Sequence, residues 1–180
     1  MTTTATILIR PEGQVADEWT SVATAADLSL VEGPAIVPFD AIDAALAERR
    51  NAPLGVHLPN HVAPDAVEPY LTQVALVSVA FPAFSDGRGF SLAKRIRRAG
   101  FTGRLRATGP LIADQFADAL ACGFDEVALP EAVATRQPAE QWVEARSIVR
   151  DHYQSGYEGG ASILEQRRAA AAAKAEGSHA

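Results

Sequence analysis

The sequence is poor in cysteine, with one residue, Cys122, in a chain of 180. A single thiol excludes an internal disulfide and any iron–sulfur or zinc site built only from cysteines of one chain. We interpret Cys122 as a small buried hydrophobic residue rather than a reactive thiol, because nothing near it in the sequence resembles an activating base.

Long apolar runs are also missing, so we expect no segment to span a membrane. Residues 1–6 contain no lysine or arginine, and the apolar stretch typical of a secretory signal peptide does not follow them. These absences predict a cytoplasmic protein that does not bind a membrane.

Nucleotide-binding motifs are lacking as well. The chain has no Walker-type Gly-Lys-Ser/Thr, and Gly87-Arg88-Gly89 begins like a dinucleotide fingerprint but has Leu92 at the third glycine position. No acidic residue follows about 20 residues later in the expected role. We therefore expect no standard NAD, FAD or ATP site, and the sequence identifies no cofactor.

Acidic residues outnumber basic ones, 22 to 16, which argues against nucleic acid as a partner. Residues 87–113 are the exception, because they contain no acidic residue. Their seven basic residues are Arg88, Lys94, Arg95, Arg97, Arg98, Arg104 and Arg106. Positive charge concentrated in an acidic chain attracts anions. This basic segment therefore predicts a small anionic ligand.

Short apolar runs alternate with amphipathic stretches from residue 34 onward. Strands are expected at residues 35–38, 54–58, 75–81, 104–108 and 126–129. Helices are expected from residues 42, 65, 91 and 110, with a last one at 139–151, and Gly123 as the C-terminal cap of the fourth. About five parallel βα units predict an α/β fold, either an open sheet or a partial barrel of TIM type.

The ends of the chain differ from this pattern. Residues 5–30 include an apolar strand and a turn and predict a small N-terminal β-element. We expect one α/β domain over residues 1–154 and an alanine-rich, flexible tail over residues 155–180. A homo-oligomer that completes or covers the sheet is compatible with the sequence, which does not itself indicate one.

The loop after the third predicted strand combines two glycines with charged residues. The loop could form an oxyanion pocket from three features. Ser91 would cap the following helix, whose free N–H groups point into the loop. Gly87 and Gly89 would let the backbone approach the ligand closely, and Arg88 would add its guanidinium. The alternative is a tight turn in which Asp86 and Arg88 pair with each other. Both interpretations fit the local sequence.

Arg106 is the second candidate for anion binding. It shares one face of its strand with Arg104 and Thr108, and an arginine there needs a partner. It is either a second arm of an anion clamp or an ion-pair partner of a carboxylate, with Asp86, Asp114 and Glu126 as candidates. We expect both, a carboxylate that holds the arginine and an arginine that faces the ligand. Asp114 and Gln115 could orient either one.

Two further groups have simpler explanations. His57 and His61 are spaced like helical metal ligands, but Pro59 lies between them and His57 belongs to the end of a strand, so we interpret them as histidines of a strand end and a loop and predict no metal site. The predicted third helix has a basic face that we expect to be solvated, with docking to an acidic partner as the alternative. That face consists of Lys94, Arg95, Arg97 and Arg98.

Several sequence blocks resemble a bacterial domain-of-unknown-function family, number 934, often labelled as an oxidoreductase of sulfite reduction. The blocks span residues 79–91, 103–109, 114–116 and 122–125, within a likeness that extends over residues 7–154. The residues that match the family's sequence pattern are Phe84, Asp86, Gly87, Arg88, Gly89, Ser91, Leu105, Arg106, Ala107, Asp114 and Gln115. Arg104 and Pro110 replace acidic residues usual in the family, so the basic segment is partly particular to this chain.

The resemblance implies a role in sulfur assimilation. We expect an accessory protein of assimilatory sulfate or sulfite reduction that binds a small oxyanion or phosphorylated ligand. The alternatives are a redox enzyme of sulfite reduction with a borrowed cofactor, and a non-catalytic docking or assembly module for sulfite reductase.

Overall fold

The computed structural model describes residues 6–48 and 51–146. The predicted tail over residues 155–180, and the end of the predicted domain, lie outside these ranges. The strands are β1 (Thr6–Arg10), β2 (Gly13–Val15), β3 (Thr20–Ser21), β4 (Ala35–Pro38), β5 (Leu54–Leu58), β6 (Leu76–Ala80), β7 (Arg104–Thr108) and β8 (Glu126–Pro130). The α-helices are α1 (Ile42–Ala47), α2 (Pro64–Val67), α3 (Arg88–Arg98), α4 (Phe116–Ala121), α5 (Glu131–Ala134) and α6 (Ala139–Ala145). Short 3-10 helices are η1 (Ala25–Leu30), η2 (Phe39–Ala41), η3 (Glu68–Tyr70) and η4 (Ala113–Gln115).

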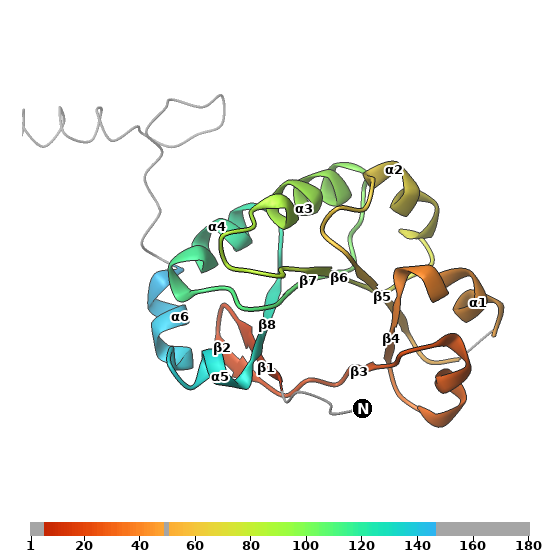
Figure 1. Cartoon of the computed structure of the whole chain (residues 1–180), viewed down its shortest axis with the longest axis horizontal. Coiled ribbons are helices and arrows are strands. Elements are labelled where there is room, and N and C mark those ends of the chain that lie inside the picture. Colours follow the sequence, from red (N-terminus) through yellow and green to blue (C-terminus); the bar gives the residue numbers. More distant parts are fainter. Residues whose placement is uncertain (1–5, 49–50, 147–180) are drawn as a thin grey trace, which may run out of the picture. The chain divides into compact units, whose positions relative to one another are not determined.

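All eight strands form one sheet in the order β2-β1-β8-β7-β6-β5-β4-β3. Strands β3 to β8 run parallel to one another, and β1 pairs antiparallel with both β2 and β8. The sheet curls into an open half-barrel with α2, α3 and α4 on its convex side (Figure 1). The predicted α/β class is therefore confirmed, with a sheet that is open and curled into part of a barrel.

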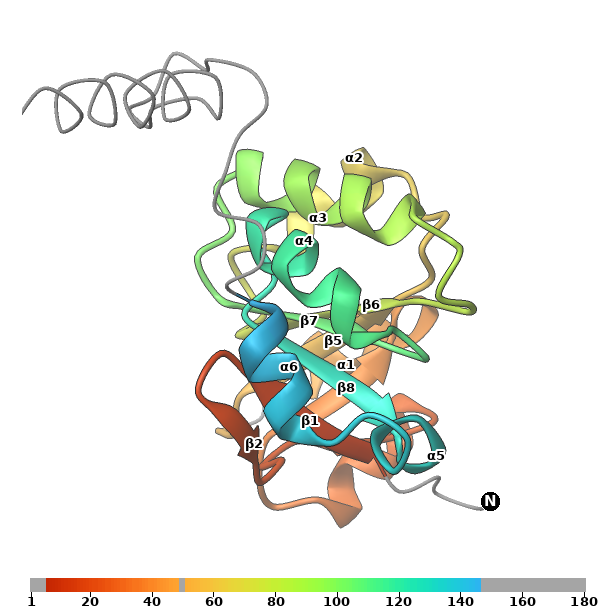
Figure 2. The same cartoon turned by 90° about the vertical axis from the view of Figure 1, so that its left-hand side faces the viewer.

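The convex face of the sheet carries the main hydrophobic core. Alternate residues of the central strands, such as Val77, Val79 and Leu105, are fully buried in one cluster with Leu92 and Ile96 of α3. Figure 2 shows α3 and α4 stacked over this face of the sheet. Because side chains alternate along a strand, the residues between these apolar positions project into the concave face.

The predicted strands agree with the structure to within a residue at each end, and the N-terminal β-element is the β1–β2 hairpin. Two helix starts were wrong. Helix α3 begins at Arg88 rather than near Ser91. Pro110 does not begin a helix: it lies in a bend in which the Leu111 N–H donates to the Gly109 carbonyl, the side chain of Leu111 is buried, and η4 starts only at Ala113.

Gly123 follows the last turn of α4 with a φ of +101°, which confirms the predicted glycine cap. The last predicted helix, residues 139–151, is seen as α6 up to Ala145, and the remainder lies beyond the part that the structure describes. Strand β3 has only two residues, too few to give a recognisable sequence pattern.

Candidate functional site

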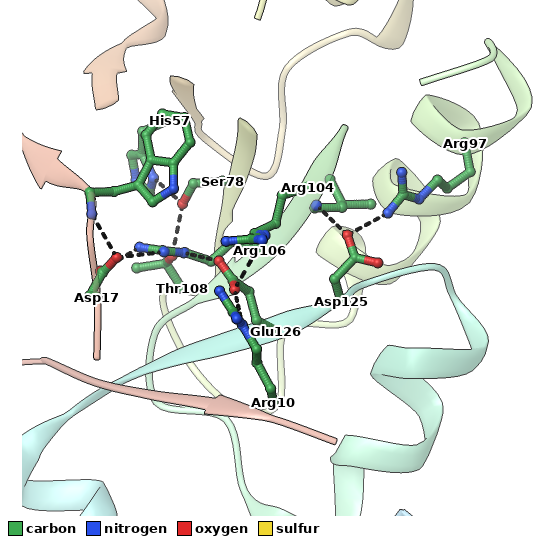
Figure 3. Close-up of polar contacts among 12 residues, drawn as sticks. Arg10, Asp17, His57, Ser78, Arg97, Arg104, Arg106, Thr108, Asp125 and Glu126 are labelled. Carbon is green, nitrogen blue, oxygen red and sulfur yellow. Dashed lines mark hydrogen bonds and ion pairs between the residues drawn. The ribbon is translucent and has the colours of Figure 1, made fainter. Parts of the chain in front are cut away.

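A row of polar side chains crosses the concave face of the sheet. The strand register places His57 of β5 beside Ser78 of β6, Ser78 beside Arg106 of β7, and Arg106 beside Glu126 of β8. Ser78, Arg106 and Glu126 are buried, with exposed fractions of 2%, 3% and 0%. Four neighbouring strands therefore each contribute a polar side chain to one inner surface (Figure 3).

One end of this row is a chain of hydrogen bonds. The Nδ1 atom of His57 lies 2.9 Å from the Ser78 hydroxyl, which lies 2.7 Å from the hydroxyl of Thr108. Burial lowers the pKa of His57, so the imidazole is neutral at neutral pH. Its Nε2 atom has no hydrogen-bond partner among the described residues. The chain thus combines a neutral ring nitrogen with two hydroxyl groups.

The other end of the row is a network of ion pairs around Arg106. Its Nε donates to Oε1 of Glu126 at 2.8 Å, and its two terminal nitrogens donate to the two carboxylate oxygens of Asp17 at 2.7 and 2.8 Å. Oε2 of Glu126 also accepts from Arg10 at 2.9 Å and lies 3.7 Å from Nε of Arg104. Arg106 is therefore held by carboxylates on both sides.

Part of this polar surface lines a cavity of about 580 Å³ on the concave face. His57, Ser78, Arg106 and Thr108 form the wall contributed by the central strands, and residues 17, 19–22, 36 and 38 lie around them. The Trp19 ring packs close to the sheet, since a Cβ built on Gly55 would lie 3.1 Å from it. The cavity lies toward the carboxyl ends of the parallel strands, where α/β proteins commonly bind ligands.

The predicted Asp86–Arg88 loop forms a separate unit. Arg88 donates to both oxygens of Asp86, at 2.9 and 2.6 Å, and Asn60 donates to the same carboxylate at 2.9 Å. The hydrogen bond from Arg88, and to a smaller extent the one from Asn60, holds the pKa of Asp86 well below its usual range. The structure therefore favours the tight-turn alternative, in which aspartate and arginine pair with each other.

Arg88 and Arg106 line different cavities. Arg88 is largely exposed and borders a shallow pocket with Asn60, His61 and Arg95. None of these residues borders the concave cavity. The structure therefore does not bring the two arginines into one clamp, and of the eight predicted ligand-binding residues only Arg106 lines the concave cavity.

The other predicted site residues lie around the start of α3 or on η4. Gly87 is the N-cap of α3, and Gly89 lies in its first turn against the ring of Phe81. Ser91 is an exposed residue inside the helix and not its cap. Gln115 donates to the carbonyl of Phe84 at 2.8 Å, while Asp114 is exposed.

Sequence reasoning missed Asp17, Ser78 and Thr108 as site residues, and it gave His57, in the expected strand 54–58, no role in the site. His57 lies within β5 and faces the cavity. Ser78 did carry a signal, as the one hydroxyl in a run of apolar residues from 75 to 81. Asp17 carried none, because it lies in an irregular segment 89 residues from its partner Arg106.

The prediction that all four basic residues of α3 face solvent was wrong for Arg97. The guanidinium of Arg97 donates to the carbonyls of Gly123, Phe101 and Gly103 and to the carboxylate of Asp125. It therefore joins α3 to the loops at the start of β7 and β8, whereas Lys94, Arg95 and Arg98 are exposed. Cys122 is buried, and burial raises the pKa of its thiol, as expected for a small core residue.

Two kinds of site are absent from residues 6–48 and 51–146. No group of three or more His, Cys, Asp or Glu side chains there could hold a metal ion. Within the same ranges, no helix is long and apolar enough to cross a bilayer.

The fold and the cavity define a half-barrel α/β protein with a polar, ion-paired concave face. The model of a family described as bacterial proteins of unknown function (DUF934) matches residues 55–164. The chain belongs to this family. No curated protein and no solved structure gives a significant match.

Proposed function

We propose that the protein binds a small oxyanion in the cavity on the concave face of its sheet. The observation that carries this proposal is that Arg106, in the cavity wall, has N–H groups without a hydrogen-bond partner among the described residues. A guanidinium has five N–H groups, and three of those of Arg106 bind Asp17 and Glu126. One N–H on each terminal nitrogen therefore has no partner among the described residues.

The neighbouring groups suit the same class of ligand. Depending on the direction of the hydrogen-bond chain through Ser78, either the hydroxyl of Thr108 or the Nε2 atom of His57 presents a hydrogen to the cavity. Three arginines, Arg10, Arg104 and Arg106, share this region with the carboxylates of Asp17 and Glu126. The positive charge in excess favours an anion.

The sulfur context of the proposal comes from the family resemblance. We propose a cytoplasmic accessory role in assimilatory sulfate or sulfite reduction, in which the ligand is sulfite, sulfate, phosphate or an adenylylated sulfate. The binding geometry of the cavity is compatible with each of these oxyanions because all of them present several acceptor oxygens.

Thermal unfolding with each of these anions, at matched ionic strength, tests the proposal. A ligand at about 100 times its Kd stabilises the native state by about 2.7 kcal/mol, so the melting temperature should rise by several degrees. Thr108→Val, which removes one donor from the cavity wall, should reduce the rise. No shift with any of the anions would contradict the proposal.

Arg88→Ala is the matched comparison, because Arg88 lies in the separate pocket of the Asp86–Arg88 loop. It should leave the anion-dependent rise unchanged. Loss of the rise in Arg88→Ala with retention in Thr108→Val would move the anion site from the concave cavity to the loop.

A second candidate function, docking to an acidic partner such as sulfite reductase, is favoured by the exposed side of α3. Lys94, Arg95 and Arg98 are exposed there, and none has an ion-pair partner among the described residues. Lys94→Glu with Arg98→Glu should abolish co-purification with the reductase and leave anion binding intact. Unchanged co-purification would exclude this face as the docking surface.

A further inference from the structure

The two carboxylates that bind Arg106 differ in how firmly they are built into the fold. Glu126 lies inside β8, is fully buried, and is shared with Arg10. The Asp17 side chain is 22% exposed and belongs to residues 16–19, an irregular segment between the edge strands β2 and β3. Glu126 is therefore a permanent partner, whereas Asp17 reaches the arginine from the surface.

The segment that carries Asp17 has few other attachments to the described residues. The Oδ1 atom of Asp17 accepts a hydrogen bond from the backbone N–H of Trp19 at 3.0 Å, which is a bond within the segment itself. Beyond it, β3 pairs with β4 through two residues. The bidentate ion pair with Arg106 and the contact of Trp19 with Gly55 are therefore the main links between this segment and the concave face.

The charge of Arg106 explains why an anion must occupy the position that the Asp17 carboxylate now fills. Arg106 is 4% exposed, and the buried carboxylate of Glu126 is shared among three arginines. Without a second anion, the terminal nitrogens of Arg106 would be left unpaired in the protein interior, which is unfavourable. An anion at this place is thus required, but it need not be supplied by the chain.

We infer that Asp17 occupies the anion subsite of the cavity as an internal substitute for the ligand, and that the ligand carries a carboxylate or an equivalent pair of oxygens that replaces Asp17 on Arg106. The inference rests on the proposed function and specifies its ligand class. The fork of the guanidinium matches two oxygens of one group, as the paired 2.7 and 2.8 Å bonds to Asp17 demonstrate. Binding would release residues 16–19 from the sheet.

Chemical rescue tests this exchange. Asp17→Ala removes the internal carboxylate, and formate, the smallest anion with the same pair of oxygens, is the probe. Formate should raise the melting temperature of Asp17→Ala well above the value in chloride at equal ionic strength. It should also bind the variant about tenfold or more tightly than the wild type, since the wild-type subsite is free only a fraction of the time.

Glu18→Ala is the matched control, because Glu18 is the neighbouring exposed acidic residue and does not line the concave cavity. It should respond to formate as the wild type does. Asp17→Asn, which removes the charge but leaves an amide in the place of the carboxylate, provides a second variant and should show a weaker rescue than Asp17→Ala.

Equal effects of formate and chloride on both Asp17 variants would overturn the inference. A variant that folds only when it is purified in formate would support it. Failure to fold in either anion would contradict it, because Asp17 would then be a permanent structural partner. If sulfite or phosphate stabilises the wild type but formate does not distinguish Asp17→Ala, the proposed function stands and the exchange is wrong.

Discussion

The two oxygens of the Glu126 carboxylate bind two different arginines. Oε1 accepts from Nε of Arg106 and Oε2 from Nε of Arg10, at 2.8 and 2.9 Å. Arg10 lies on the antiparallel strand β1 and Arg106 on the parallel strand β7, with β8 between them. This carboxylate therefore joins the N-terminal hairpin to the parallel part of the sheet.

Glu126→Gln should destabilise the protein by about 3–5 kcal/mol, because it leaves a buried guanidinium without one of its counter-charges. Denaturant unfolding at neutral pH measures the loss. Glu32→Gln, at an exposed loop position, is the control and should change stability by no more than about 0.5 kcal/mol. Equal stability of the two variants would show that the network around Arg106 is not needed for folding.

Arg97 and Arg98 are neighbours on α3 with different surroundings. Arg97→Ala should cost about 2–3 kcal/mol, because three backbone carbonyls and Asp125 lose a charged donor. Arg98→Ala should have an effect of no more than about 0.5 kcal/mol, since that side chain is exposed. Unfolding free energies of the two variants check the difference, and equal values would contradict the bracing role of Arg97.

Gly87, the N-cap of α3, and Gly89, in its first turn, should respond differently to alanine. A Cβ on Gly89 would lie 2.4 Å from the ring of the buried Phe81, whereas one on Gly87 would meet its nearest atom at 3.8 Å. Gly89→Ala should therefore lose about 1–3 kcal/mol to overpacking, less any gain in helix propensity. Gly87→Ala should be close to neutral.

Thermal unfolding of the two glycine variants gives the measurement. If Gly87→Ala were the more damaging, the loop would need backbone freedom at the position that the structure leaves open. That result would favour the original interpretation of this loop as a close-approach site for a ligand.

Much of the fold follows from local pattern. Strand β7 was predicted with its bounds, and the alternation along it already placed Arg104, Arg106 and Thr108 on one face. Glu126 was among the carboxylates expected to pair with Arg106, and the structure shows that pair. These features depend on side-chain periodicity and on the need of a buried charge for a partner, both of which are readable from sequence.

The rest of the site depends on tertiary geometry. The curl of the sheet brings residues 16–19 across its concave face, so Asp17 reaches Arg106, and no local pattern reports that approach. Arg97 was assigned to solvent because it follows Ile96 on an amphipathic helix. Its long side chain instead reaches the Gly123 carbonyl beyond the end of α4, a contact that only the packed structure reveals.

The buried imidazole of His57 gives a pH dependence with a definite sign. Burial lowers the pKa of His57 in the folded protein, so below its ordinary value of 6.5 the unfolded chain takes up a proton first. Stability should therefore fall as the pH decreases from 6.5 toward the lowered folded-state pKa, and this loss should be smaller in His57→Gln. Urea unfolding of both proteins in steps from about pH 7.5 to about pH 5 measures the difference, in which the other titrating groups cancel. Parallel profiles would mean that the imidazole of His57 is hydrated in solution, and the cavity wall would then lack the neutral ring nitrogen that the proposed ligand site uses.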